Sequence, residues 1–342
     1  MRDVSSLVDR IHRRDSVLAL LAIGLAGAAP RIAAQAAATL RRIGFLTLRA
    51  EPNEYDAAFR DAMRRLGYIE GSTLQIDYRW AAGSEQRAEE LAAELAASNV
   101  EVIVTATTAA IRATMRATKS IPIVMAASAD PIIAGIVASH AQPGGNVTGL
   151  SMVSTDTATK RLQLLRELLP SATRVAVLLF GASAPGPRDQ GNALLVEQLR
   201  TASRQLGMSL IVAGIGSGAD IAAAFATMER NGAQALIVQA SAVTIDNRAR
   251  IVELAATHRL PAVYETEGFV DAGGLLSYGP SLVEMYRRSA IYVDKILKGA
   301  KPASLPIEQP DKYDLVIHRK TARALGLKIP PALIVRADRL IE

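Results

Sequence analysis

Residues 100–126 read VEVIVTATTAAIRATMRATKSIPIVMA, and they contain two short apolar runs with a segment of helical spacing between them. The runs, 100–105 and 121–126, are rich in β-branched residues, which is typical of parallel strands buried on both faces. A helix is predicted to begin near Thr108, and another near Pro131 after the second run. Because such connections make right-handed crossovers, this unit predicts a parallel α/β sheet.

The same alternation continues on both sides of this unit. Further strands are predicted at 42–48, 74–80, 174–180, 209–213, 235–239 and 260–264, and further helices at 54–66, 86–97, 192–206, 220–231 and 246–258. A turn-rich segment, residues 142–149, separates the two arrays. The predicted fold class is therefore α/β, with two doubly wound parallel-sheet lobes and a ligand cleft between them.

The first 38 residues have the composition of a signal peptide. His12, Arg13 and Arg14 precede an apolar run at 17–29, and small residues follow at 33–38. A basic region, a short apolar region and a small-residue cleavage site predict export, by the general secretory or the twin-arginine route, and cleavage of residues 1–38. The alternative is an apolar helix that belongs to the fold. We expect the mature protein to be periplasmic.

Composition and motifs argue against several classes of function. The formal net charge of +6 is spread along the 342 residues, and this distribution does not indicate a nucleic-acid partner. There is no cysteine, and the four histidines, at 12, 140, 258 and 318, are far apart in the sequence. Residues 214–218 lack the third glycine of a dinucleotide loop, and 149–153 lack the second glycine of a nucleophile elbow. We therefore expect no catalytic residues, no metal and no cofactor.

Candidate binding residues follow the predicted strands, where the carboxyl ends of a parallel sheet receive ligands. They include residues 239–241 and Ser183, and the candidates to which we assign ligand contact are Thr47, Thr105, Thr107, Thr108, Ala129, Asp130, Ser241, Tyr264, Glu265 and Tyr278. Hydroxyls at helix starts offer donors to a carboxylate, and Asp130 or Glu265 is suited to an ammonium group. Ordinary alternatives are helix capping by Asp130 and the threonines, and core packing of the tyrosines.

Several motifs carry a resemblance to a known family. They are RIGFL at 42–46, Asp130-Pro131, PGGNVTG at 143–149, EGFV at 267–270, GGLLSYG at 273–279, YVDKILKG at 292–299, LPIEQP at 305–310 and LGLKIP at 325–330. In this order, and across the whole predicted mature chain, they resemble the substrate-binding proteins of bacterial ABC importers, in the tryptophan/tyrosine-type branch.

The resemblance implies a type I periplasmic-binding fold with a three-crossing hinge near Leu150, Gly279 and Lys312. One lobe then comprises 39–150 plus 279–312, and the other 151–278 plus 313–342. The family's ligand loops align with the candidate residues named above. One departure is FGASAP at 180–185, where many relatives have an aromatic-Asn-Pro turn.

The function implied is a monomeric, non-enzymatic solute-binding subunit. It captures a small polar organic ligand, such as an amino acid, and delivers it to a membrane permease with its ATPase. The alternative is a sensing module of the same fold that signals through a receptor. An enzyme that uses Asp130 and Glu265 is a third hypothesis. A cytoplasmic repressor of this fold needs an N-terminal helix-turn-helix, whereas this sequence has the predicted signal peptide at that position, which argues against a repressor.

Overall fold

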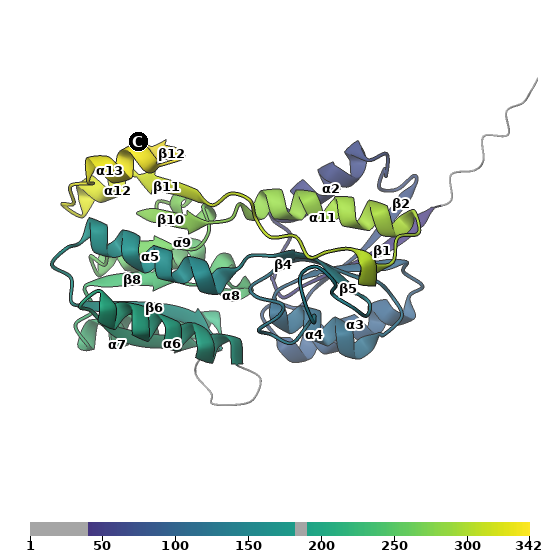
Figure 1. Cartoon of the computed structure of the whole chain (residues 1–342), viewed down its shortest axis with the longest axis horizontal. Coiled ribbons are helices and arrows are strands. Elements are labelled where there is room, and N and C mark those ends of the chain that lie inside the picture. The colour runs from purple at the N-terminus through teal and green to yellow at the C-terminus, as the bar shows by residue number, and fades with distance from the viewer. Residues whose placement is uncertain (1–39, 182–189) are drawn as a thin grey trace, which may run out of the picture. The chain divides into compact units, whose positions relative to one another are not determined.

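The computed structural model describes residues 40–181 and 190–342, and its strands form two sheets (Figure 1). The predicted signal peptide and the candidate Ser183 lie outside these described residues. The first sheet has five strands in the order β2-β1-β3-β4-β5, and the second has seven in the order β12-β11-β10-β9-β8-β6-β7. The predicted α/β class with two sheet-centred lobes is confirmed.

The first sheet is parallel throughout. Its elements are β1 (Arg41–Thr47), α2 (Glu54–Arg65), β2 (Leu74–Trp80), α3 (Glu85–Ala97), β3 (Val102–Ala106), α4 (Thr108–Ala117), β4 (Ile123–Ser128) and β5 (Val147–Ser151). Strands β3 and β4 are buried along their whole length, as the opening sequence predicts, whereas the edge strand β2 is partly exposed.

The second sheet is mixed. Its elements are α5 (Ser154–Leu168), β6 (Arg174–Phe180), α6 (Gln190–Gln205), β7 (Ser209–Ile215), α7 (Ile221–Arg230), β8 (Ala235–Val238), α8 (Ala242–Asp246), α9 (Arg248–Thr257), β9 (Ala262–Tyr264), α10 (Gly268–Asp271), β10 (Leu276–Gly279), β11 (Asp314–His318), α12 (Arg319–Ala324), α13 (Pro331–Arg336) and β12 (Arg339–Ile341). Only β10 and β11 pair antiparallel among these described strands. Between them the chain makes α11 (Leu282–Leu297) against the first sheet, and it re-enters the second sheet at the edge from which it left.

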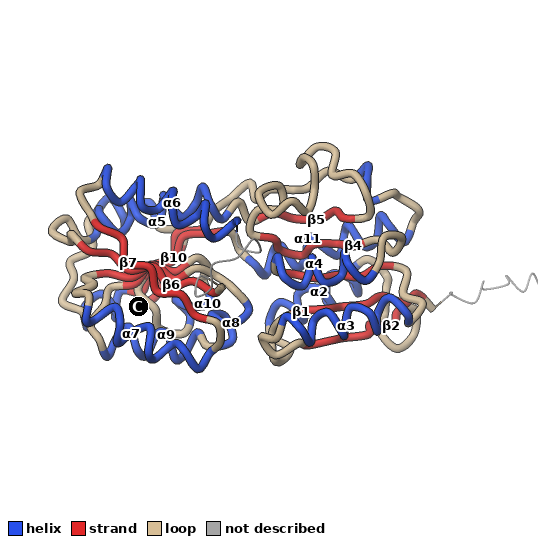
Figure 2. Tube along the Cα trace, turned by 90° about the horizontal axis from the view of Figure 1, so that it is seen from below, coloured by secondary structure: helices blue, strands red, loops and turns tan. Residues whose placement is uncertain are grey.

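Helices cover both faces of each sheet (Figure 2). On the first sheet, α2 and α11 pack together on one face although they are more than 200 residues apart, and α3 packs with α4 on the other. On the second sheet, α5 and α6 share one face, and α7 and α9 share the opposite face. The apolar cores under these helices hold the carboxyl ends of the strands in fixed positions.

The prediction that a helix begins near Pro131 is wrong. Residues 131–135 form turns, in which the Asp130 Oδ1 accepts a hydrogen bond from the Ile133 N–H at 3.1 Å. Gly135 has a φ of 64°, and the Ile136 N–H returns to the Pro131 carbonyl at 2.8 Å. The left-handed glycine closes the turn and places Ile136 in the same buried apolar cluster as the β4 residue Ile123, so the helix does not propagate.

Candidate functional site

A cavity of about 580 Å³ opens at the carboxyl ends of strands from both sheets. The residues that follow β1, β3 and β4 line it from the first sheet, and those that follow β6 and β8 line it from the second. Its strand-end segments are 47–49, 106–109, 129–130, 179–181 and 239–243. This edge is where open parallel sheets bind ligands, because the loops and helix starts converge there.

Six of the predicted ligand residues line this cavity, namely Thr47, Thr107, Thr108, Ala129, Asp130 and Ser241. Some of their side chains also have local partners. The Ser241 Oγ accepts a hydrogen bond from the Thr244 N–H at 3.1 Å and caps α8, and the Asp130 Oδ1 closes its turn. Ser241 therefore caps α8, whereas Asp130 closes a turn and caps no helix, and contact of either residue with a ligand stays a prediction.

The other four predicted residues do not line the cavity. Thr105 is within β3 at 1% exposure, and the ring of Tyr264 stacks on Phe269 with centroids 4.8 Å apart. Glu265 is fully buried, and Tyr278 lies near Tyr313 with ring centroids 6.0 Å apart. Strand-end position and the resemblance to the family selected them, but neither shows that the pleat turns alternate side chains toward the core.

The start of α4 presents unpaired donors to the cavity. Thr107 precedes the helix with φ 73° and ψ 143°, and its side chain makes no capping hydrogen bond. Its Oγ1 is buried without a partner among the described residues, and Thr108 and Ala109 also line the cavity. The first N–H groups of a helix have no intrahelical acceptor and carry partial positive charge, so this end suits a carboxylate.

The N-cap Thr107 is also strained. A β-branched residue at positive φ costs free energy, and such conformations concentrate at functional sites. The opening of α5 has the same feature, because Val153 has φ 50° and ψ 44° and provides no capping side chain. Two strained and uncapped helix starts thus meet the cavity, one from each sheet.

A buried arginine that sequence reasoning missed supports the cavity wall. Arg49 is 2% exposed, and its Nη1 and Nη2 donate to the Asp56 carboxylate at 2.6 and 2.8 Å. Its guanidinium lies 5.8 and 6.0 Å from the ring centroids of Tyr55 and Tyr286. Burial raises the pKa of the Tyr286 phenol to about 12, so the phenol stays neutral at physiological pH. Asp56 thus compensates the charge of Arg49.

Two polar contacts join elements of the first sheet to elements of the second beside the cavity. The Ala50 N–H, just after β1, donates to the Asp246 Oδ2 at the end of α8 at 2.8 Å. The Arg248 Nη2 lies 3.4 Å from the Glu54 Oε2. These contacts are exposed, and contacts of that kind contribute little to stability by themselves.

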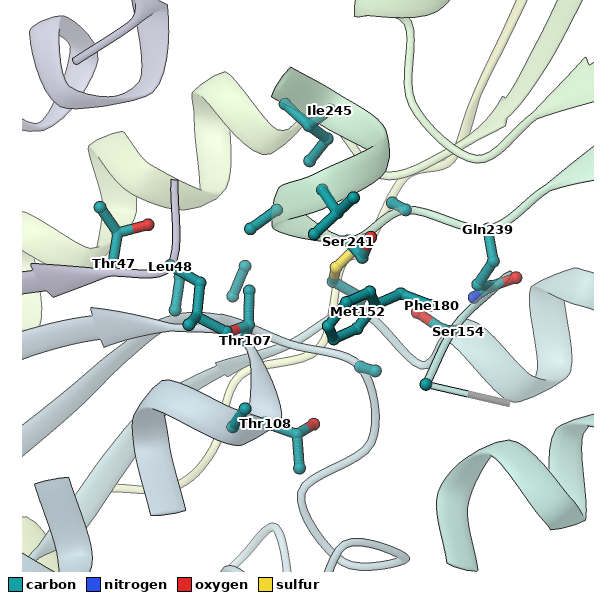
Figure 3. A pocket seen from close by; sticks show the side chains of 18 of the residues that line it. Thr47, Leu48, Thr107, Thr108, Met152, Ser154, Phe180, Gln239, Ser241 and Ile245 are labelled. Carbon is teal, nitrogen blue, oxygen red and sulfur yellow. The ribbon is translucent and has the colours of Figure 1, made fainter. Parts of the chain in front are cut away.

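The cavity combines these polar ends with an apolar middle. Leu48, Met152, Phe180 and Ile245 surround the space, with Thr47 and Thr107 toward one end and Ser154 and Gln239 toward the other (Figure 3). Sequence reasoning missed Met152 and Ser154 because the strand before them, β5, begins in the segment that was interpreted as a turn-rich break. The arrangement suits a solute with an apolar body and polar groups at its ends.

Within the described ranges 40–181 and 190–342, no group of histidine, aspartate and glutamate residues is arranged to hold a metal ion. Over the same residues, no helix combines the length and the apolar composition needed to cross a bilayer.

Comparison with known proteins identifies a family model and a curated relative that both describe binding proteins. The model of the family described as ABC transporter substrate binding protein matches residues 53–341. A tyrosine-binding protein of Clostridioides difficile is 24% identical over 271 residues, which cover 79% of this chain and 76% of that protein.

Solved structures show the same fold. A conserved domain protein of Vibrio cholerae is 28% identical with a TM-score of 0.80, covering 88% of this chain and 100% of that one. An ABC domain of Streptococcus pneumonia in complex with L-Trp is 24% identical with a TM-score of 0.79, covering 89% of this chain and 100% of that one.

Proposed function

Because the chain belongs to the family of ABC transporter substrate-binding proteins, we propose that it is the extracytoplasmic binding subunit of an importer. In this proposal it captures an amino acid in the cavity and delivers it to a membrane permease with its ATPase, without catalysing a reaction. It acts as a monomer in the periplasm after removal of residues 1–38.

The observation that carries the proposal is the uncapped start of α4 in a cavity lined from both sheets. The N–H groups of Thr108 and Ala109, with the Thr107 hydroxyl, bind the α-carboxylate. The ammonium group lies toward the Asp130 carboxylate, whose Oδ1 accepts the Ile133 N–H. The apolar middle receives the side chain, consistent with the names of the tyrosine-binding relative and the L-Trp complex.

Ligand capture is coupled to lobe closure in this proposal. The three crossings near Leu150, Gly279 and Lys312 act as the hinge. A solute that contacts residues from both sheets stabilises the closed state, since only such a solute has different affinities for the two states. The closed form is the one that docks on the permease.

The proposal is tested by mass spectrometry of small molecules released from the purified chain, followed by isothermal titration calorimetry with each standard amino acid. We expect one or a few amino acids to bind at one per chain. Asp130→Asn is expected to weaken binding by about tenfold, because a hydrogen bond to a charged group contributes ~1.5 kcal/mol or more. Failure of every amino acid to bind would overturn the proposed ligand class.

A further inference from the structure

We propose that the second-sheet end of the cavity is a separate polar subsite, which binds a hydrogen-bond acceptor on the solute at the end away from its carboxylate. The inference rests on the proposed function and adds that the amino acid carries a hydrogen-bond acceptor on its side chain. Its residues are Ser154, at the start of α5, and Gln239, after β8, with Arg161 as a positioning residue.

Ser154 supplies the first donor. The residue lines the cavity and is 3% exposed, yet its Oγ has no hydrogen-bond partner in the described part of the chain. It opens a helix of 15 residues whose N-cap, Val153, provides no side-chain cap. A buried hydroxyl without a partner costs free energy, and a solute oxygen at this position removes that cost.

Gln239 supplies the second donor, and its orientation is determined by Arg161. The Gln239 Oε1 accepts a hydrogen bond from the Arg161 Nη2 at 3.1 Å. Because a guanidinium has only donors, the amide oxygen must face Arg161 and the amide nitrogen must face away from it. Gln239 is 7% exposed, and Figure 3 shows its nitrogen on the side of the cavity and of Ser154.

Arg161 is itself held rigidly. It is fully buried, and it also donates to the Thr157 Oγ1 at 3.1 Å and to the Tyr278 carbonyl at 3.2 Å. Its Nη2 lies 3.4 Å from the Oε1 of the fully buried Glu265. The Glu265 Oε2 accepts the Ala240 N–H at 2.8 Å, so this carboxylate also fixes the backbone that follows Gln239. Glu265, which sequence reasoning assigned to the ligand, thus compensates the arginine charge.

The chemistry of the subsite follows from these contacts. Gln239 offers a neutral N–H and Ser154 a neutral hydroxyl to the cavity, and the buried charges of Arg161 and Glu265 behind them compensate each other. The subsite therefore favours a carbonyl, hydroxyl or phenolic oxygen over an ammonium group. Met152 and Phe180 lie between it and Thr107 in the view of Figure 3, so the acceptor belongs at the far end of an apolar or aromatic body.

L-Tyrosine and L-phenylalanine test this subsite, because they differ by one oxygen at the end away from the carboxylate. Calorimetric titration of the purified chain is expected to show tighter binding of tyrosine, by at least about tenfold. Ser154→Ala is expected to reduce this preference by about 3- to 10-fold, and Gln239→Met to reduce it similarly. The matched control is Ser203→Ala, which removes another fully buried serine Oγ without a partner, from α6 and outside the cavity.

Each outcome bears on the inference. Equal affinity for the two amino acids would overturn it and leave the proposed function standing, as would a tyrosine preference that neither variant reduces. Binding of no amino acid at all would overturn the proposed ligand class, and this inference with it. Thermal melting of each variant identifies any loss of folding. If Gln239→Met does not fold, the tyrosine preference of Ser154→Ala alone tests the subsite, because that variant leaves the Arg161 contacts in place.

Discussion

Thr107→Gly is expected to stabilise the protein and to weaken ligand binding at the same time. Threonine at φ 73° carries strain of about 1–3 kcal/mol, which glycine does not. Glycine adds about 0.5–1 kcal/mol of conformational entropy to the unfolded chain and loses part of one methyl group's burial. The Thr107 Oγ1 has no protein partner, so its removal leaves no other group unpaired within the described residues. The net gain in the free energy of unfolding is about 1 kcal/mol.

Differential scanning calorimetry measures this effect. For a chain of this size, a gain of about 1 kcal/mol raises Tm by about 2 °C. The matched control is Thr108→Gly, one residue further along, where the helical backbone gives glycine no advantage and the cost is up to ~1 kcal/mol. The two substitutions should therefore shift Tm in opposite directions.

Ligand binding provides the second measurement. Loss of the Thr107 hydroxyl should lower affinity for the amino acid by about 2- to 10-fold, as for one neutral hydrogen bond. If Thr107→Gly lowers Tm as much as Thr108→Gly does, the positive φ is not strained, and the argument that strain is retained here for binding is refuted.

Three further outcomes are expected. Gly279→Ala should lower the free energy of unfolding by more than ~2 kcal/mol in urea, because an added Cβ would lie 1.9 Å from the Glu265 carbonyl oxygen. A loss below about 0.5 kcal/mol would show that the backbone there relaxes freely. Glu265→Gln should cost about 3–5 kcal/mol, because it leaves Arg161 buried without its counter-charge, and unchanged stability would show that water or another group compensates the charge. Burial, together with the nearby Lys320 and Arg323, lowers the pKa of His318 below its ordinary 6.5. The unfolded chain therefore binds more protons at this histidine than the folded chain does. The free energy of unfolding falls as the pH drops through 6.5. His318→Asn retains a capping side chain and should lose less stability than the wild type between about pH 7 and 5, and identical pH profiles would contradict this.

The class of the fold could be predicted from local sequence. Buried parallel strands need uninterrupted β-branched runs, and the runs at 100–105 and 121–126 became β3 and β4, with α4 between them. The turn at Pro131 could not be predicted in this way. An Asp-Pro pair starts a helix and a capped turn equally well, and the choice depended on Gly135 and on the burial of Ile136 in the apolar cluster that includes Ile123.

The position of the cavity could be predicted from the sequence, but only some of the residues that line it could. Strand ends converge in any parallel sheet, so Thr47, Thr107, Thr108 and Ser241 were found by counting along the chain. Counting does not show which way a side chain points, and for that reason Glu265 was assigned to a ligand although it faces a buried arginine.

The sequence by itself determined the alternation of strands and helices over much of the chain, several of the strand ends that supply the cavity and the resemblance to a family, because these depend on local periodicity and short motifs. Only the tertiary structure decided that Arg161 and Glu265, which are 104 positions apart, form a buried pair, and that Gln239 is oriented by that pair. Burial and pairing of charges depend on which faces of distant elements meet. That outcome is set by packing of the whole chain, and no local pattern encodes it.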